Sequence, residues 1–200
     1  MAYTLSDLTS KLRLKINQVS TNSNLVWEDS ELYGYINAAI KHVINFGSLK
    51  LIQASAYKRT TDAAGDHLTN NGSGYATKPS DYLRYINGKV DAKYIRRIID
   101  ASEIEFIQGN SLTAADSNRK YVCDISGTEF LVFPTDFSSF ELVYIAEPSD
   151  LASSTDTSPL TNTGDNYALD WAYALALESK LFKPEVAQVI FKRVQELIMQ

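Results

Sequence analysis

Apolar residues recur at helical spacing near both ends of the chain, and this pattern constrains the fold more than any other feature. Leucine, isoleucine and valine return every three or four residues from about 5 to 19 and again from about 30 to 46. Near the other end, a helix rich in alanine covers about 167–177, and a further helix begins at Pro184. Because none of these helices can bury its apolar side alone, we expect the four to pack together as one discontinuous bundle.

Short polar signals mark where these helices begin and end. Thr4 is followed three residues later by Asp7, a capping pattern that begins a helix. Asp29 or Ser30 begins the second helix, and Gly47 is expected to end it, because glycine commonly follows the last helical turn. The predicted buried stripe of the last helix consists of Val186, Ile190, Val194 and Leu197.

The middle of the chain carries the signals of strands and turns. Asn87 and Gly88 lie between two apolar runs, and because both tolerate a positive φ they predict the turn of a β-hairpin. Ser126 and Gly127 predict a second turn in the same way. The other elements predicted here are a strand at 51–60, a short helix at 100–107, a hairpin of 121–125 with 128–133, and a strand at 140–145.

The predicted fold class is therefore α+β, in a single compact subunit. Residues 1–60 and 165–200 form the helical bundle, and residues 61–164 form a small antiparallel β lobe with long loops. The stretches 61–78 and 147–164 are polar and contain few large apolar groups. We expect both to be mobile in an isolated subunit, because they cannot order themselves through buried area.

Charge and cysteine usage narrow the classes of function. The net charge is +3 over residues 1–60, −7 over 61–164 and −1 over 165–200, so a strongly basic surface for gripping phosphates is not expected. No apolar run approaches the ~18–20 residues of a membrane span, and the first residues lack the signature of a signal peptide. The lone Cys123 excludes an internal disulfide and fits a reducing cytoplasm.

Few residues are suited to catalysis or metal binding. His42 has no histidine one helical turn away, so it cannot form a two-histidine metal face. His67 lies near Asp62 and Asp66, where we favour a solvated loop over a metal site. Cys123 is interpreted as a small packing residue rather than a nucleophile. We predict no catalytic, cofactor-binding or metal-ligating residues.

Aromatic and arginine residues interleave in the middle of the chain, which is a pattern that can stack on single-stranded nucleic acid. An antiparallel hairpin with alternating faces explains the pattern equally well, and the local acidity opposes nucleic-acid binding. The twelve tyrosines also suit surfaces that become half-buried at protein contacts. The interleaved residues are Tyr82, Arg84, Tyr85, Tyr94, Arg96 and Arg97.

Several features follow one another in a characteristic order. A leucine-spaced helix leads through a polar break to residues 27–32, and residues 79–84 precede short strands. A strand then ends as Tyr-Ile-Ala-Glu-Pro at 144–148, before an alanine-rich helix around Trp171 and a helix that begins at Pro184. From about residue 5 to 198, this order resembles the head-to-tail connector, or adaptor, proteins of tailed double-stranded-DNA bacteriophages.

The resemblance implies a non-enzymatic virion protein that is present in the host cytoplasm during assembly and needs no cofactor. Such proteins form a ring, often of twelve copies, beneath the portal protein and meet the next tail or connector ring on the other side. Genomic DNA passes through without tight binding, and no membrane is involved. The alternatives are a tail-terminating or tail-completion protein, and an enzyme or regulatory nucleic-acid-binding protein.

If the chain forms such a ring, an acidic lumen would keep the duplex centred, because like charges repel. The acidic segment 61–164 is the candidate source of these carboxylates. An equally open interpretation places the same carboxylates on the solvated outer wall. The candidate channel-facing residues are Asp62, Asp66, Asp116 and Asp156.

Overall fold

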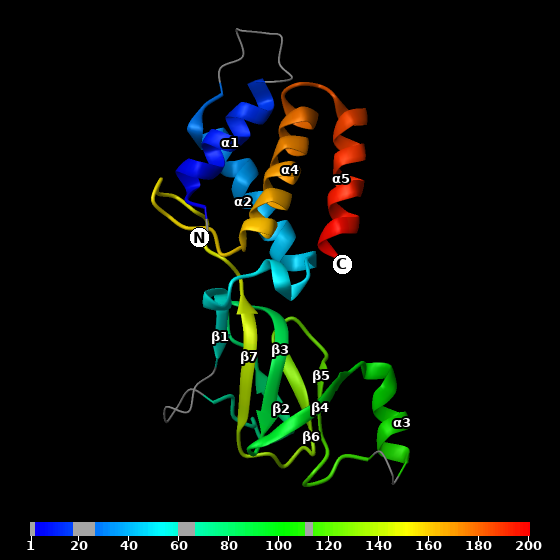
Figure 1. The fold of residues 1–200 in the computed structure, drawn as a ribbon. Helices are drawn as coiled ribbons and strands as arrows, with labels where there is room; N and C mark the ends of the chain where they lie inside the picture. The colour runs from blue at the N-terminus through cyan, green and yellow to red at the C-terminus, as the bar shows by residue number, and fades with distance from the viewer. Residues whose placement is uncertain (1–2, 18–26, 60–66, 111–113) are drawn as a thin grey trace. The chain divides into compact units, whose positions relative to one another are not determined.

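The computed structural model describes residues 3–17, 27–59, 67–110 and 114–200 (Figure 1). This part of the chain contains five α-helices and a mixed sheet of seven strands, which confirms the predicted α+β class. The chain divides into two compact units. The helical unit comprises Met1–Ala56 and Pro148–Gln200, and the sheet unit comprises Tyr57–Glu147.

The helical unit is arranged around α4, the alanine-rich helix. This helix contacts α1, α2 and α5, and the small side chains of Ala168, Ala172 and Ala176 are buried in it. Small side chains let neighbouring helices approach on several sides, as the nearly continuous apolar sequence of α4 predicted. The elements of this unit are α1 (Leu5–Asn17), α2 (Asp29–Phe46), η1 (Leu49–Leu51), η2 (Ala54–Ala56), α4 (Asn162–Ser179) and α5 (Pro184–Ile198).

The predicted start of α1 and both predicted ends of α2 are confirmed, whereas the end predicted for the first helix, at about residue 19, lies outside the described residues. The Asp7 backbone N–H donates to Thr4 Oγ1 at 3.2 Å, and the Thr4 N–H donates to Asp7 Oδ2 at 3.0 Å, so the two residues cap α1 reciprocally. The second helix ends at Gly47, whose N–H donates to the Val43 carbonyl at 2.7 Å. A Cβ at Gly47 would lie 2.4 Å from that carbonyl oxygen, so only glycine fits this close return of the backbone.

The polar segment before α4 is held by two amide side chains of the helical unit. Its mobility in an isolated subunit stays a prediction. Asn37 exchanges two hydrogen bonds with the backbone of Leu151, at 2.9 and 3.1 Å. The Gln53 side chain donates to the carbonyl of Leu160 at 2.6 Å, and both leucines are buried. Hydrogen bonds to the backbone and two buried leucines thus replace the large apolar surface that the segment lacks.

The sheet unit has the strand order β1-β7-β3-β4-β5-β6-β2. Every neighbouring pair is antiparallel except β4 and β5, which are parallel, so the prediction of an antiparallel lobe is wrong at this pair. The segment between them contains α3 and acts as a crossover, which returns the chain in the same direction. The elements are β1 (Tyr57–Arg59), β2 (Tyr75–Thr77), β3 (Tyr82–Val90), β4 (Lys93–Ile99), η3 (Ala101–Glu103), α3 (Ile104–Gly109), β5 (Lys120–Asp124), β6 (Glu129–Phe133) and β7 (Phe140–Ala146).

The predicted turn at Asn87 and Gly88 is also wrong. Both residues lie inside β3, and the turn is made by Asp91 and Ala92, whose φ angles are 49° and 63°. Gly88 is needed for close packing instead, because a Cβ there would lie 2.7 Å from the Glu141 carbonyl oxygen. The hairpin of β5 with β6 and the strand β7 are confirmed. Of the strand predicted at 51–60, residue 60 lies outside the described residues, and among 51–59 only Tyr57–Arg59 forms a strand.

Replacing Gly88 with alanine should therefore destabilise the sheet unit by about 1–3 kcal/mol, because the added methyl group must displace backbone as well as side chains. Gly127→Ala is the matched control, since no atom lies within 4 Å of its added Cβ, and it should change stability by at most about 0.5 kcal/mol. Chemical denaturation followed by circular dichroism measures both. Equal stabilities of the two variants would contradict the packing role of Gly88.

Candidate functional site

The candidate channel-facing carboxylates do not form one cluster in the part of the chain that the structure describes. Asp62 and Asp66 lie outside the described residues. Asp116 belongs to the sheet unit and Asp156 to the helical unit. Each of the two described carboxylates organises its own turn, so their environments are considered separately below.

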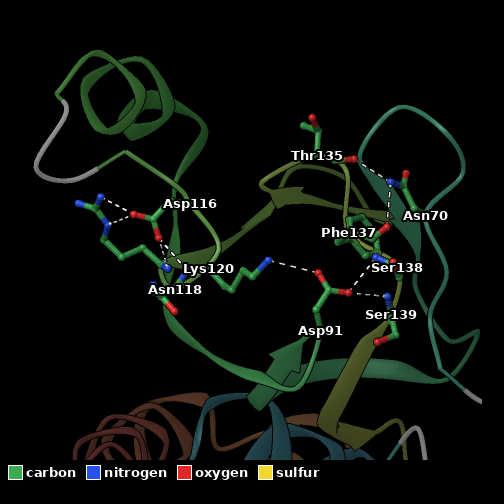
Figure 2. A network of polar contacts seen from close by, with 10 residues as sticks. Asn70, Asp91, Asp116, Asn118, Lys120, Thr135, Phe137, Ser138 and Ser139 are labelled. Carbon is green, nitrogen blue, oxygen red and sulfur yellow. Dashed lines mark hydrogen bonds and ion pairs between the residues drawn. The ribbon is translucent and has the colours of Figure 1, made fainter.

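Asp116 holds the turn that leads into β5. Its Oδ1 accepts the backbone N–H groups of Asn118 and Arg119, at 2.7 and 2.8 Å, and its Oδ2 accepts the Arg119 Nε–H at 2.8 Å (Figure 2). The hydrogen bond from the Arg119 guanidinium, followed by that from the Asn118 N–H, lowers the pKa of Asp116 to about 2. This carboxylate is therefore ionised at neutral pH and partly neutralised by its own arginine.

Asp156 caps a turn in the segment before α4. Its Oδ2 accepts the backbone N–H groups of Ala152 and Ser153, both at 2.8 Å. These two hydrogen bonds lower the pKa of Asp156 below its ordinary value. Among the described residues, backbone N–H groups rather than a cationic side chain hold Asp156, so it presents more of its negative charge to solvent than Asp116 does.

The residues considered for catalysis lie in different surroundings. Cys123 is fully buried in β5, and burial raises the pKa of its thiol, which disfavours the nucleophilic thiolate. His42 lies on α2 in the helical unit, whereas His67 and Cys123 lie in the sheet unit. Within the described residues, no three His, Cys, Asp or Glu side chains are grouped so that they could hold a metal ion.

His42 takes part in an aromatic cluster of the helical unit. Its ring stacks on Trp171 with centroids 3.5 Å apart, and its Nε2 lies 2.8 Å from Gln195 Oε1. Burial lowers the pKa of His42 below 6.5, although the hydrogen bond with Gln195 acts in the opposite direction. The neutral imidazole thus serves the packing of α2 against α4 and α5.

The stability of the protein should consequently fall as the pH falls through about 6.5. The unfolded chain then takes up a proton at residue 42 more readily than the folded protein does, so acid favours unfolding. The free energy of unfolding, measured between pH 7.5 and 5.5, should decrease more for the wild type than for His42→Asn. A steeper decrease in the variant would contradict a lowered pKa in the folded state.

Two lysines are buried in the sheet unit, and nothing in their sequence surroundings indicated this. Lys120 has a side chain that is 6% exposed, and its Nζ lies 3.2 Å from Asp91 Oδ2. Asp91 Oδ1 also accepts the N–H groups of Ser138 and Ser139, at 2.8 and 3.1 Å (Figure 2). Burial alone would raise the pKa of Asp91, but these hydrogen bonds and the lysine outweigh it and the pKa lies below its ordinary value. The pair ties the β3–β4 turn to β5 and to the loop before β7.

Lys78 is the second buried lysine, at the edge of a surface hollow of about 460 Å³. Its Nζ lies 2.5 Å from Asp124 Oδ1, donates to the Ser126 carbonyl, and lies 5.0 and 4.8 Å from the ring centroids of Tyr82 and Phe130. These partners occupy the ammonium group. The hollow therefore offers an internally compensated ion pair rather than a free cation for a phosphate.

The interleaved aromatic and arginine residues do not form one exposed stacking surface. Tyr82 and Tyr85 pack partly buried against the core of the sheet unit, and burial raises the pKa of Tyr85 to about 12. Tyr94 is exposed on β4, with Lys89 Nζ 5.1 Å from its ring centroid. Arg96 is exposed next to it. The pattern is therefore divided between the core and the surface. Tyr82 and Tyr85 are three residues apart and still reach the same core, because the pairing of β3 with β7 is irregular beside both residues.

Sequence reasoning placed one residue of the α5 stripe wrongly. Val186 was assigned to the buried stripe but is 48% exposed, whereas Val194 is buried and Ile190 packs partly buried against the core, as predicted. The helix also buries Ala187 and Ile198. Val189 is exposed as well. The helix has apolar residues on two faces, and spacing alone does not say which face meets the core. Val186 and Val189, three residues apart on the helix, were the available signal for the second face.

The family model described as SU10 adaptor protein matches residues 3–196 of this chain. No curated protein matches it. None of the described helices combines the length and the hydropathy that crossing a membrane requires. The family match spans both compact units, so it concerns the whole arrangement of helices and sheet rather than one short motif.

Proposed function

Because this chain belongs to the SU10 adaptor protein family, a family of structural phage proteins, we propose that it forms a ring between the head and the tail of a tailed bacteriophage. The family match over residues 3–196 is the observation that carries this proposal. In the virion, the ring would dock beneath the portal protein and meet the next tail or connector ring. Genomic DNA would pass through its centre, and the chain would act without catalysis or a cofactor.

The electrostatic part of the proposal concerns the lumen of this ring. Asp116 and Asp156 are ionised at neutral pH and lie in exposed turns, so either could supply negative charge to a channel. An acidic channel would bind the duplex less tightly than a basic one, because each phosphate that a lysine or arginine neutralises adds affinity. A density map of the assembled ring tests this point, and a lumen lined mainly by lysine and arginine would contradict it.

Assembly of the purified chain tests the proposed function itself. Sedimentation velocity over a range of concentrations, together with electron microscopy, should show a closed ring in equilibrium with the monomer. Head-to-tail contacts that close on themselves produce such a species, whereas contacts that do not close produce open filaments. A chain that remains monomeric at every concentration, or that forms only open tubes, would contradict the proposal. His42→Ala and Cys123→Ala should still form rings. Each substitution should only lower the stability of the subunit, because a packed side chain is removed.

A further inference from the structure

Helix α5 has an apolar face that no element of the described chain covers. Val186 and Val189 are 48% and 69% exposed, and Phe182, in the turn before the helix, is 84% exposed. The spacing of three and then four residues places Val186, Val189 and the exposed Arg193 in one row on the helix, which begins at Pro184. We call these three residues the α5 row.

Phe182, in the turn just before α5, has an unusual backbone conformation. Its φ of 51° lies in the left-handed region, where glycine is ordinarily favoured. A bulky residue in this region is strained, yet here it places a large apolar side chain in water. Phe182 therefore adds a further exposed apolar side chain beside the start of α5.

Helix α1 has a complementary outward face. Leu14 is 62% exposed, and Ser10 and Asp7 are exposed at four and seven residues before it. We call these three residues the α1 face. Because the Ser10 side chain is small, it leaves a shallow depression on the helix surface between Leu14 and Asp7. An apolar side chain of a neighbouring helix can occupy such a position, as in the packing of ridges into grooves.

The two faces lie on different sides of the same unit. Helix α4 contacts both α1 and α5, which lie on either side of it in Figure 1. Tyr3 N–H donates to Asp165 at the start of α4, and Lys15 pairs with Asp170 farther along, so α1 and α4 run in the same direction. The short turn after α4 reverses the chain, and α5 therefore runs opposite to α1.

We propose that the α5 row of one subunit packs antiparallel against the α1 face of the next subunit in the ring. This inference rests on the proposed ring-forming function. Each helix carries three such side chains in one row, and an antiparallel arrangement brings the opposite charges of Arg193 and Asp7 together at one end. The facing pairs are Arg193 with Asp7, Val189 with Ser10, and Val186 with Leu14.

The symmetry of a ring favours this pairing over a pairing of α5 with itself. A closed ring needs two different faces that meet head to tail, whereas one face meeting its own copy stops at a dimer. Rotation about an axis along the helices leaves their directions unchanged, so α1 of the next subunit still runs opposite to α5. The charge complement between a carboxylate on α1 and a guanidinium on α5 selects the register.

Paired cysteines test this contact directly. Under mild oxidation, Ser10→Cys with Val189→Cys in the same chain should give a ladder of covalently linked subunits, because facing Cβ atoms come within disulfide reach. Ser10→Cys with Gln188→Cys is the matched control. Moving one residue along α5 rotates the thiol by about 100° around the helix, so this pair should remain largely monomeric. The native Cys123 is buried and should not join the ladder.

The outcomes separate the contact from the proposed function. A ladder confined to the Ser10 and Val189 pair supports the contact. Rings of the wild-type chain without a ladder, or equal ladders from both pairs, would overturn this contact and leave the proposed function standing. A wild-type chain that never forms rings would overturn both. As a second measurement, Val189→Glu and Ser10→Glu should each abolish rings alone but form a one-to-one dimer when mixed, because each variant retains one competent face.

Discussion

Replacing Asp91 with alanine should destabilise the sheet unit by about 2–3 kcal/mol, among the largest losses expected for a single polar substitution in this protein. The change would leave the Lys120 ammonium buried without its carboxylate, since that side chain is 6% exposed. It would also remove the acceptor for the N–H groups of Ser138 and Ser139. Because Asp91 itself is partly exposed, the expected loss is smaller than the ~3–5 kcal/mol of a fully buried pair that loses one partner.

The complementary substitution should behave differently. Lys120→Met removes the charge that needs a partner and keeps the volume of the side chain, so its cost should be less than about 1 kcal/mol. The double variant should recover part of the loss caused by Asp91→Ala, because no unpaired charge then remains. The loss should not disappear, since the turn still lacks its acceptor and alanine replaces aspartate at a φ of 49°.

Urea denaturation followed by circular dichroism measures the whole cycle. A double-mutant coupling near zero would mean that the lysine and the aspartate do not depend on one another. If Lys120→Met proved as costly as Asp91→Ala, the attraction within the ion pair would account for the loss of stability. The cost of a buried, unpaired ammonium group would then not be its cause.

The sequence predicted helices better than it predicted the sheet, and the reason is physical. The signals of a helix are local. The capping pair Thr4 and Asp7 and the apolar spacing along α2 can each be recognised within a single element. The partner of a strand is a distant part of the chain. Nothing near Gly88 shows that Glu141 approaches it closely, so a glycine needed for packing resembled a glycine needed for a turn.

The candidate site was less predictable than the fold for the same reason. The acidic character of Asp116 and Asp156 is visible in the sequence, but the N–H groups and the arginine that hold these carboxylates depend on the conformation of each turn. The burial of Lys120 depends on a carboxylate 29 residues earlier. Exposure of Val186 depends on which side of α5 meets α4, because both sides carry apolar residues.

Phe140→Ala should have the largest effect of any substitution considered, with a loss of about 3–5 kcal/mol in the sheet unit. Phe140 is fully buried at the centre of that unit, where its ring meets Phe130 edge-on with centroids 5.6 Å apart. Removing the ring loses buried apolar area and leaves a cavity that the surrounding strands cannot fill. Phe106→Ala, on an exposed side chain of α3 in the same unit, should cost about 0.5 kcal/mol or less.

The two tryptophans make this substitution informative about the organisation of the chain. Trp27 and Trp171 both belong to the helical unit, so tryptophan fluorescence reports on that unit, whereas circular dichroism reports on both. Because each unit has its own buried core, Phe140→Ala should lower the midpoint of the sheet transition and leave the fluorescence transition in place. A fluorescence midpoint that fell together with the dichroism midpoint would show instead that the two cores unfold as one cooperative structure.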